Sequence, residues 1–236
     1  DYPRAYKMID ELQPQAVIFS DGGPGCRWVG NESGFAGATN WSFLRAGEVY
    51  PGYPKYRELQ YGHADGNQWV AAECDVSIRP GWFYHPEEDD KVKTVDQLTD
   101  LYYRSVGHNA TLLLNFPVDR NGLIHPTDSL NAVSFHQRVQ KELADNLLSS
   151  AKVVASDERG GKFKVRAATD GQYETYWATN DGVTSADLTF TFTQPTKMNR
   201  VMIQEYIPLG QRVKSFVVEY KETNGCRLNV TRILPP

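Results

Sequence analysis

Four carboxyl side chains in the first third of the chain lie in or just after predicted strand ends: Asp21, Glu32, Glu73 and Asp75. Carboxylates among aromatic side chains are typical of carbohydrate hydrolysis, in which two carboxyl groups flank the glycosidic bond, about 5–5.5 Å apart in retaining enzymes. An apolar wall helps such a site, because it raises the pKa of one carboxyl group until that group can donate a proton. The tryptophans nearest in sequence are Trp28, Trp41, Trp69 and Trp82.

The same four acids have a purely structural alternative. Each could cap a helix or pair with an arginine such as Arg27 or Arg79, and the sequence leaves this open.

The sequence shows no motif of a serine hydrolase, a phosphate-binding loop or a metal site. No Gly-x-Ser-x-Gly motif occurs, the glycine-rich run 22–25 has no Gly-Lys-Ser/Thr, and the histidines show no metal-ligand spacing. We therefore expect neither a metal in this site nor a cofactor. His85 follows an aromatic run and is kept as a site candidate.

The elements that would position these acids alternate between strand and helix. Apolar runs that end in polar residues predict buried parallel strands at 16–21 and 111–115. A further strand is predicted over 69–78, after a polar and aromatic loop of residues 22–68 that is too long for a plain connector. Helical spacing of apolar residues favours helices ending at Leu12 and covering 95–106 and 133–148.

Strand–loop–helix units with polar residues at the strand ends indicate an α/β fold, part of a (β/α)8 barrel over residues 1–148. Such a barrel keeps its active site at the carboxyl ends of its strands, where the four acids are predicted to lie. A closed barrel needs eight units and about 250 residues, whereas this region offers three to four. We therefore expect half of the barrel to lie outside this chain.

The pattern changes near Ser149, and residues 149–236 favour an all-β antiparallel sandwich. Two runs, 188–192 and 216–220, alternate with a period of two. The region is shorter than the roughly 100 residues of a typical sandwich, so a truncated module is expected. The tail from Cys226 to Pro236 shows little strand pattern and stays unplaced.

The composition excludes several partners. A formal net charge of −4 gives no basic face for nucleic acid, and no apolar run reaches the ~20 residues that span a bilayer.

A disulfide between Cys26 and Cys74 is an option if their segments are neighbours. Of the four Asn-x-Ser/Thr sequons, at Asn31, Asn40, Asn109 and Asn229, the first adjoins Glu32. A glycan there would crowd the site, which favours a bacterial source that leaves sequons unmodified.

Three long, ungapped motifs give the first region a family resemblance. They are Ala16–Pro24 followed by Arg27–Glu32, the stretch Asp75–His85, and Ser105–Ala110 followed by Leu112–Asn115. Together they resemble glycoside hydrolase family 29, the α-L-fucosidases, over about residues 14–135. The variant resembles the subgroup that prefers branched α-1,3/1,4-fucosides. Such enzymes imply a bacterial periplasmic or secreted location.

This resemblance implies a retaining mechanism and assigns roles to residues. Glu32 matches the family's acid/base, and Trp28 and Trp82 would form an apolar wall for the C6 methyl group of fucose. The nucleophile of the family, an aspartate in a Trp-Phe-Asp-Gly strand, would precede this chain. Asp21 is then a loop-shaping residue. The remaining candidates for contact with the fucosylated oligosaccharide are Asn31, Glu73, Arg79 and His85, with a structural role for Arg79 as an alternative.

The second region is similar to a discoidin-like (coagulation factor 5/8 type C) module, through 168–171 and 175–179. Some such modules bind galactose or a structural calcium ion. The resemblance therefore implies Asp170 as a candidate calcium ligand and Trp177 as either a core residue or a sugar platform.

Two other classes of function stay open at this stage. The first is a non-catalytic fragment or carbohydrate-binding module, because a lone acid/base cannot form a covalent intermediate. The second is a structural or adhesion protein carried by the discoidin-like module.

Overall fold

The computed structural model describes residues 1–221 and 227–232, with side chains described as far as Lys221. The chain divides into two compact units, the first ending at Lys141 and the second beginning at Glu142. The predicted domain boundary, between residues 148 and 149, lies a few residues further along the chain.

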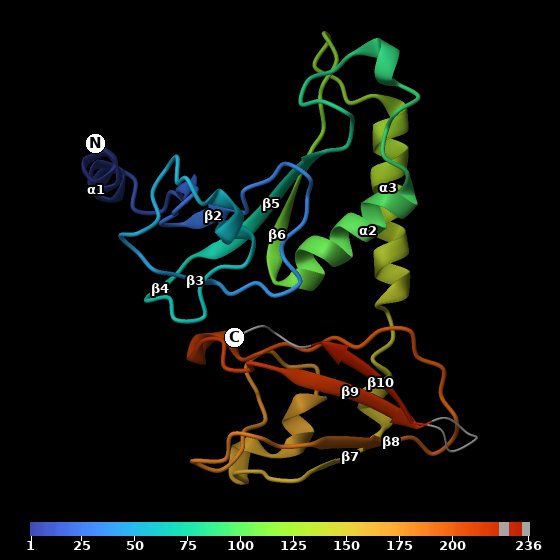
Figure 1. The fold of residues 1–236 in the computed structure, drawn as a ribbon. Coiled ribbons are helices and arrows are strands. Elements are labelled where there is room, and N and C mark those ends of the chain that lie inside the picture. The colour runs from blue at the N-terminus through green and yellow to red at the C-terminus, as the bar shows by residue number, and fades with distance from the viewer. Residues whose placement is uncertain (222–226, 233–236) are drawn as a thin grey trace. The chain divides into compact units, whose positions relative to one another are not determined.

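A four-stranded sheet forms the centre of the first unit (Figure 1). Its strands are β1 (Phe19–Ser20), β2 (Cys26–Trp28), β5 (Ala71–Ser77) and β6 (Ala110–Asn115), in the order β1-β2-β5-β6. All three pairings are parallel. The carboxyl ends of the strands therefore share one edge of the sheet, as predicted, although four strands do not close a barrel and the full barrel stays a prediction.

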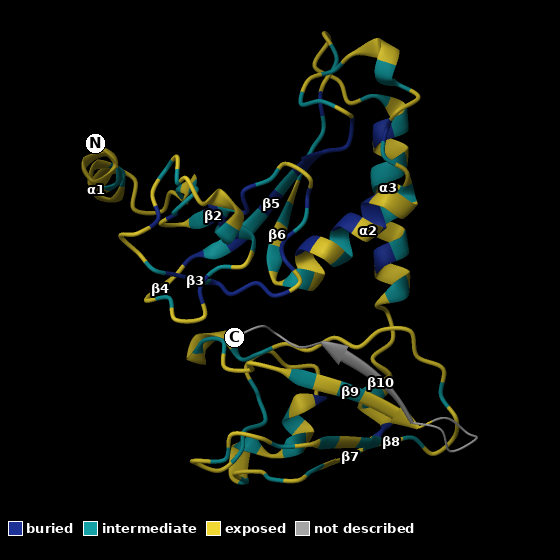
Figure 2. Ribbon diagram, viewed as in Figure 1, coloured by how far each residue is buried: buried dark blue, intermediate teal, exposed yellow. Residues whose placement is uncertain are grey.

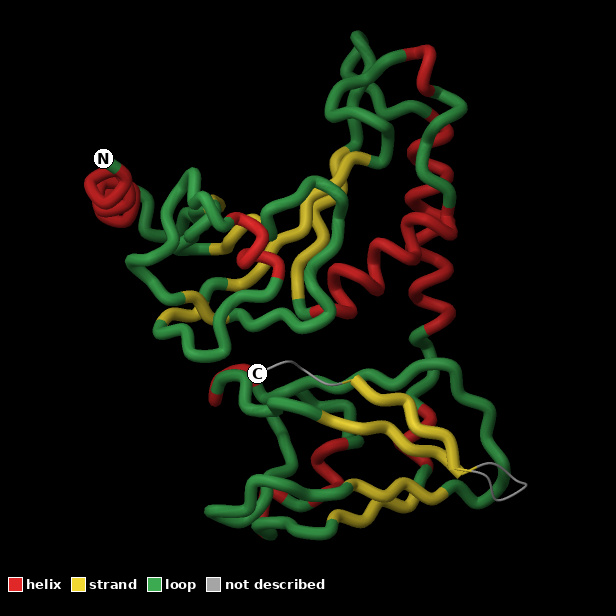
Figure 3. Tube along the Cα trace, viewed as in Figure 1, coloured by secondary structure: helices red, strands yellow, loops and turns green. Residues whose placement is uncertain are grey.

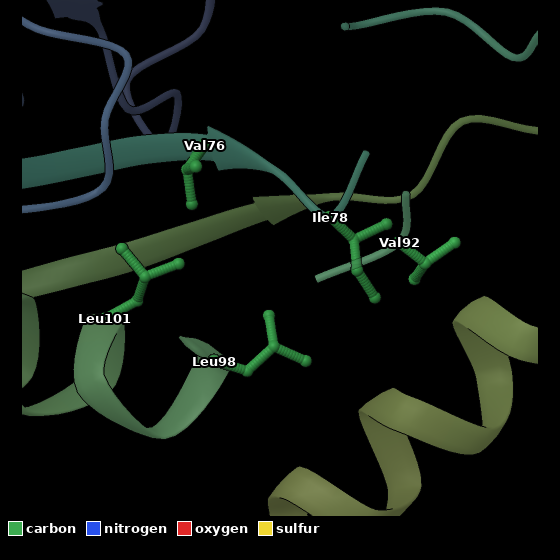
Figure 4. Packing of buried hydrophobic residues seen from close by; sticks show 5 residues of the cluster. All are labelled: Val76, Ile78, Val92, Leu98 and Leu101. Carbon is green, nitrogen blue, oxygen red and sulfur yellow. The ribbon is translucent and has the colours of Figure 1, made fainter. Parts of the chain in front are cut away.

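Three helices accompany the sheet: α1 (Tyr2–Leu12), α2 (Val95–Ser105) and α3 (Pro126–Glu142). The α2 helix begins at a capping box, in which the Thr94 hydroxyl accepts the Gln97 amide and the Gln97 side chain accepts the Thr94 amide. A hydrophobic cluster joins α2 to the sheet (Figure 4). Its buried members are Val76, Ile78, Val92, Leu98 and Leu101.

Several predicted bounds need correction. The helix predicted over 133–148 is α3, which begins at Pro126 and ends at Glu142, because Pro suits a first helical turn. The predicted strand 69–78 is divided: Gln68–Trp69 is β4, antiparallel to β3 (Phe43–Leu44), and only the rest belongs to β5. The long loop 22–68 therefore contains β2 and β3, too short for a periodic signal.

The first predicted strand is the least well placed. Only Phe19 and Ser20 of the run 16–21 pair with β2, and they form an edge of the sheet. Val17 and Phe19 are exposed rather than buried. An edge strand has one neighbour, and β2 offers only a short ladder, so the apolar run could not be buried as predicted.

The second unit consists mainly of loops, short 3-10 turns and two strand pairs (Figure 3). One antiparallel pair is β7 (Lys152–Ala155) with β8 (Leu188–Thr191), and the other is β9 (Phe216–Lys221) with β10 (Arg227–Arg232). The β10 strand lies in the tail that the sequence pattern left unplaced, whereas Cys226 lies outside the described residues. Among the side chains of this unit that are described, up to Lys221, the buried ones are Ala151 and Thr169, and Figure 2 shows this unit mostly as exposed or intermediate. The complete sandwich stays a prediction.

None of the helices in the described ranges is both long and apolar enough to cross a membrane.

Candidate active site

The register of the central sheet decides which side chains can meet. Cys26 is paired with Ala71 and Trp28 with Glu73. Because side chains alternate between the faces of a sheet, Trp28, Glu73 and Asp75 share one face, and all three are half-buried. Arg27, Cys74 and Val76 point to the opposite face and are buried there. Two of the predicted acids are thus brought beside a predicted tryptophan.

Glu32 follows β2 in a tight loop that fixes its backbone. The Asn31 side chain accepts the Ser33 amide at 2.9 Å and donates to the Phe35 carbonyl at 3.0 Å. Gly30 before it has a φ of +77°, and a Cβ there would lie 2.3 Å from the Tyr56 carbonyl oxygen. No other residue fits that position without a shift of the backbone. Asn31, predicted to contact substrate, uses its amide to shape this loop.

The Glu32 carboxylate meets the next loop of the same edge. Trp82 Nε1 donates a hydrogen bond to Glu32 Oε2 at 2.8 Å. Asn115, at the carboxyl end of β6, donates to the Trp82 carbonyl at 3.1 Å and to Ser77 Oγ at 3.2 Å. Hydrogen bonds at the carboxyl ends of β5 and β6 therefore anchor the loop that contains Trp82, and Trp82 in turn orients Glu32. Asn115 was recognised from the sequence only as a polar strand end.

A second tryptophan binds a second acid. Trp28 Nε1 donates to Asp75 Oδ1 at 2.8 Å. Partial burial raises the pKa of Asp75, the Trp28 hydrogen bond opposes this, and the charge of Glu32 raises the pKa further. Asp75 was singled out from the sequence as an acid at a strand end, but its partner follows only from the register of β2 and β5.

Glu73 lies beside Cys26 on the same face. The Cys26 thiol donates to Glu73 Oε2 at 3.8 Å. Burial raises the pKa of Glu73, the thiol contact lowers it, and the charge of Asp75 raises it. Burial, with the adjacent Glu73 carboxylate, also raises the pKa of Cys26 to about 11. A thiol in this state is a poor nucleophile at neutral pH, so Cys26 is a polar neighbour and not a reactive group.

The Cys26–Cys74 disulfide that the sequence left open is absent, since both thiols are free. Cys26 is paired with Ala71, which places Cys74 three residues further along β5 and on the opposite face. That separation is about 10 Å along the strand, well beyond the reach of a disulfide.

Arg79 is fully buried and braces the end of β5. Its Nε and Nη2 atoms each donate to a carboxylate oxygen of Asp128 at 2.8 Å, and both residues have no exposed area. Nη1 lies 2.9 Å from Asp89 Oδ1, an ion-pair contact without hydrogen-bond geometry. The Tyr84 ring stacks 4.6 Å from the guanidinium. This geometry favours the bracing role of Arg79 over direct contact with substrate.

Asp128 is the partner that sequence reasoning missed. It lies in the first turn of α3, a position where an acid also suits the helix dipole. Once α3 is known to begin at Pro126 rather than near Val133, an acid in its first turn becomes a recognisable signal.

The remaining predicted positions are on the surface or in loops. The His85 ring is exposed and lies 3.8 Å from Glu87, while its carbonyl accepts from Arg79 at 3.5 Å. Asp21 Oδ2 accepts the Gly52 amide at 2.7 Å, which agrees with a loop-shaping role. No group of three or more His, Cys, Asp or Glu side chains that could hold a metal occurs among the described residues.

In the second unit, Trp177 and Asp170 are both engaged locally. Trp177 is half-buried and its Nε1 donates to the Asp157 carbonyl at 3.1 Å. Asp170 accepts the Gln172 amide at 2.9 Å and the Thr175 hydroxyl at 2.6 Å, and these bonds hold the pKa of Asp170 below its usual range.

Two of the predicted sequons lie within a partly buried hydrogen-bond network. The Asn40 Nδ2 atom donates to the carbonyls of His108 and Asn109, and the Asn109 Nδ2 atom donates to the Asn40 carbonyl. Arg27 Nη2 donates to Asn40 Oδ1. Both sequon amides thus hold the fold together, and attaching a glycan to either would require these bonds to break.

The chain is similar in sequence to known proteins over most of its length. A rice protein (Oryza sativa subsp. japonica) named "Putative alpha-L-fucosidase 1" is 41% identical over 220 residues, which is 91% of this chain and 42% of that protein. The F5/8 type C domain model matches residues 152–227, in agreement with the discoidin-like resemblance.

Solved structures are similar over almost the whole chain. A "putative alpha-L-fucosidase" from Bacteroides thetaiotaomicron matches with a TM-score of 0.90 and 42% identity, covering 97% of this chain and 51% of that one. A Ruminococcus gnavus GH29 fucosidase in complex with fucose matches with a TM-score of 0.84 and 30% identity, covering 100% of this chain and 48% of that one. The chain therefore spans about half the length of the proteins it resembles.

Proposed function

Since this chain is related to the family 29 α-L-fucosidases over more than nine-tenths of its length, we propose that it supplies the acid/base half of an exo-acting enzyme. That enzyme releases terminal fucose from α-1,3/1,4-linked glycans with retention of configuration. One observation carries the proposal above the others. Glu32, the residue matched to the family's acid/base, sits at the carboxyl edge of a parallel sheet and is oriented by Trp82.

The mechanism divides between two carboxyl groups. In the first step an aspartate outside this chain attacks C1 of fucose, the C1–O bond breaks, and Glu32 gives its proton to the departing glycosidic oxygen. In the second step Glu32 takes a proton from water, the water oxygen bonds to C1, and the ester bond to the aspartate breaks. Each step inverts C1, so the product keeps the α configuration.

The two indoles define the proposed sugar pocket. Trp28 and Trp82 each use the ring N–H on a carboxylate, which fixes their ring planes and leaves apolar faces for the C6 methyl group of fucose. Glu73 and His85 are proposed contacts for sugar hydroxyls or for the branch beyond fucose. For Asn31 and Arg79 the proposed contribution is to hold the loops that present these groups.

The second unit is proposed to belong to a discoidin-like sandwich, with calcium or sugar as its candidate ligands. A periplasmic or secreted location in a bacterium likewise stays a proposal, since it derives from the family resemblance alone.

The experiment compares three proteins: this 236-residue chain, a full-length protein that adds the missing barrel half, and the full-length protein with Glu32→Gln. Fucose release is measured from an α-1,3/1,4-fucosylated oligosaccharide and from an aryl α-L-fucoside. We expect turnover only with the added half and its loss in Glu32→Gln. Turnover by the chain alone would mean that the nucleophile lies within it, with Asp21 the first suspect. An inactive full-length protein would reject the proposal.

A non-catalytic role is the second candidate, favoured by the fact that the chain spans about half of its relatives. In that case the inactive chain would still bind fucosylated or galactosylated glycans. A glycan array separates the two, and an array without binding would also remove support for an adhesion role of the module.

A further inference from the structure

One loop at the carboxyl edge of the sheet presents a large apolar side chain to solvent. Phe83 is 78% exposed, the highest value for any large hydrophobic residue that the structure describes. It directly follows Trp82, which donates its indole N–H to Glu32 at 2.8 Å. Neither the proposed mechanism nor the proposed fucose pocket gives Phe83 a role. Its place beside the donor to Glu32 makes it a candidate for contact with another part of the substrate.

The residues on either side of Phe83 are both anchored. On one side, the Trp82 carbonyl accepts a hydrogen bond from Asn115 at 3.1 Å. On the other side, the Tyr84 ring stacks 4.6 Å from the guanidinium of Arg79, which is fully buried. These contacts hold the backbone around Phe83 in one conformation. A ligand that covers the Phe83 ring therefore has little loop entropy to remove, and this favours binding.

The position of a general acid limits where the leaving sugar can lie. In the proposed reaction Glu32 comes within about 2.6–3.2 Å of the glycosidic oxygen, and this oxygen stays with the leaving sugar when the C1–O bond breaks. The leaving sugar therefore lies against groups that surround Glu32. The loop of Trp82 is one of these groups, because it contacts Glu32 through the 2.8 Å hydrogen bond. Phe83 is the next residue in that loop.

We propose that Phe83 is a specificity-determining residue, whose ring stacks on the pyranose that departs from fucose. This inference rests on the proposed function of Glu32 as the acid/base. A pyranose ring carries C–H groups on its faces, and the negative face of an aromatic ring attracts such groups. Covering the phenyl ring also removes its apolar surface from water. The site then selects fucosides whose leaving group is a sugar ring over fucosides whose leaving group is small.

The first test measures binding without turnover. Calorimetry gives the Kd of an α-1,3/1,4-fucosylated oligosaccharide, and of free fucose, for the full-length protein with Glu32→Gln. Adding Phe83→Ala should weaken oligosaccharide binding about tenfold or more, because the sugar loses its apolar contact, and should leave the Kd of fucose unchanged. Phe83→Tyr keeps an aromatic ring and should retain the affinity. An equal oligosaccharide Kd with Phe83 and with Ala, or no measurable binding to either, would overturn the inference.

The second test changes the leaving group. Hydrolysis of α-L-fucosyl fluoride releases a single fluoride ion, which offers no ring for Phe83 to contact. In the full-length protein, Phe83→Ala should lower kcat/KM for the oligosaccharide about tenfold and leave kcat/KM for the fluoride unchanged. Tyr173→Ala is the matched control, because Tyr173 is an aromatic residue of the second unit with 77% exposure, and it should change neither value. An equal loss for both substrates in Phe83→Ala, or a lower Tm, would mean that Phe83 packs against the rest of the protein and would overturn the inference.

The two tests fail separately from the proposed function. A full-length protein that releases no fucose, while Phe83→Ala still weakens oligosaccharide binding, rejects the function and leaves the sugar contact of Phe83 standing. Fucose release with the same oligosaccharide Kd and kcat/KM in Phe83→Ala leaves the function standing and overturns the inference.

Discussion

Two sets of carboxyl groups in the first unit differ in the charge of their partners: one set contacts a cation and the other contacts neutral donors. Asp89 and Asp128 surround the buried guanidinium of Arg79, whereas Glu32 and Asp75 each accept a tryptophan N–H and Glu73 accepts a thiol. Asp128 is fully buried and its ion pair is a fixed charge arrangement, while the second set is partly open to solvent. Burial raises the pKa of Glu73 and of Asp75, and this difference in surroundings separates bracing groups from groups suited to chemistry.

The largest expected effect concerns Glu32. Glu32→Gln in the full-length protein keeps the shape of the side chain but removes its proton transfer. General acid/base catalysis contributes about 10²- to 10⁴-fold, so we expect a fall of that order in kcat for natural fucosides. An aryl fucoside with a good leaving group should lose far less in the first step. Glu11→Gln, an exposed carboxylate on α1, is the control, and an equal loss in both variants would speak against the assignment.

The bracing set is tested by stability. Asp128→Asn leaves the buried Arg79 charge without its bidentate partner, and breaking such a pair costs about 3–5 kcal/mol. Urea unfolding of the chain measures this change. Asp65→Asn disrupts the exposed Arg45–Asp65 pair and should give no measurable loss. Similar stabilities for the two variants would mean that the Arg79–Asp128 pair is not the brace we describe.

A smaller effect is expected from the donor that orients Glu32. Trp82→Phe removes the indole N–H and keeps an aromatic ring. A hydrogen bond to a charged group is worth about 1.5–3 kcal/mol, so kcat/KM of the full-length protein should fall roughly 10- to 100-fold. Trp69→Phe, whose ring packs edge-on against Phe43, controls for loss of an indole elsewhere. If Trp82→Phe kept full activity, the hydrogen bond to Glu32 would be incidental.

The smallest effect is a change in how stability depends on pH. Glu73 and Asp75 have raised pKa values in the folded chain, so the folded state binds more protons than the unfolded state from about pH 4 upward. Their contribution is complete below the unfolded pKa and is lost as pH rises through the folded pKa. In the double variant Glu73→Gln/Asp75→Asn this loss is absent. The Tm of the double variant minus the Tm of the wild type should therefore increase as pH rises. A constant difference across pH 4–7 would exclude these groups as the cause.

Some of this site could be predicted from the sequence and some could not, for physical reasons. The acids and tryptophans stood out because strand ends and aromatic neighbours are local features. The pairs Trp28–Asp75 and Arg79–Asp128 did not, since each joins residues almost fifty positions apart and depends on register and on the exact start of α3. A family resemblance names residues, but it does not say which of them are buried, and Arg79 is the clearest example.

The fold shows the same division. The helix at 95–105 and the strand at 110–115 agree with their predicted ranges to within a residue, because each has a clear end. The strand is not buried as predicted, however, since Leu113 is exposed and the other side chains of β6 are exposed or only half-buried. The two- and three-residue strands β1, β2 and β3 are too short for periodicity and exist only through their neighbours.

The most direct test of the central claim is the configuration of the sugar that azide produces in a Glu32→Ala full-length protein. With an aryl α-L-fucoside, the aspartate that we propose outside this chain would still form the fucosyl ester, and azide would then displace it without needing a general base. Two inversions at C1 give α-L-fucosyl azide, the result we predict, with turnover restored as azide is added. A β-L-fucosyl azide product would mean a single inversion, and would identify Glu32 as the nucleophile instead.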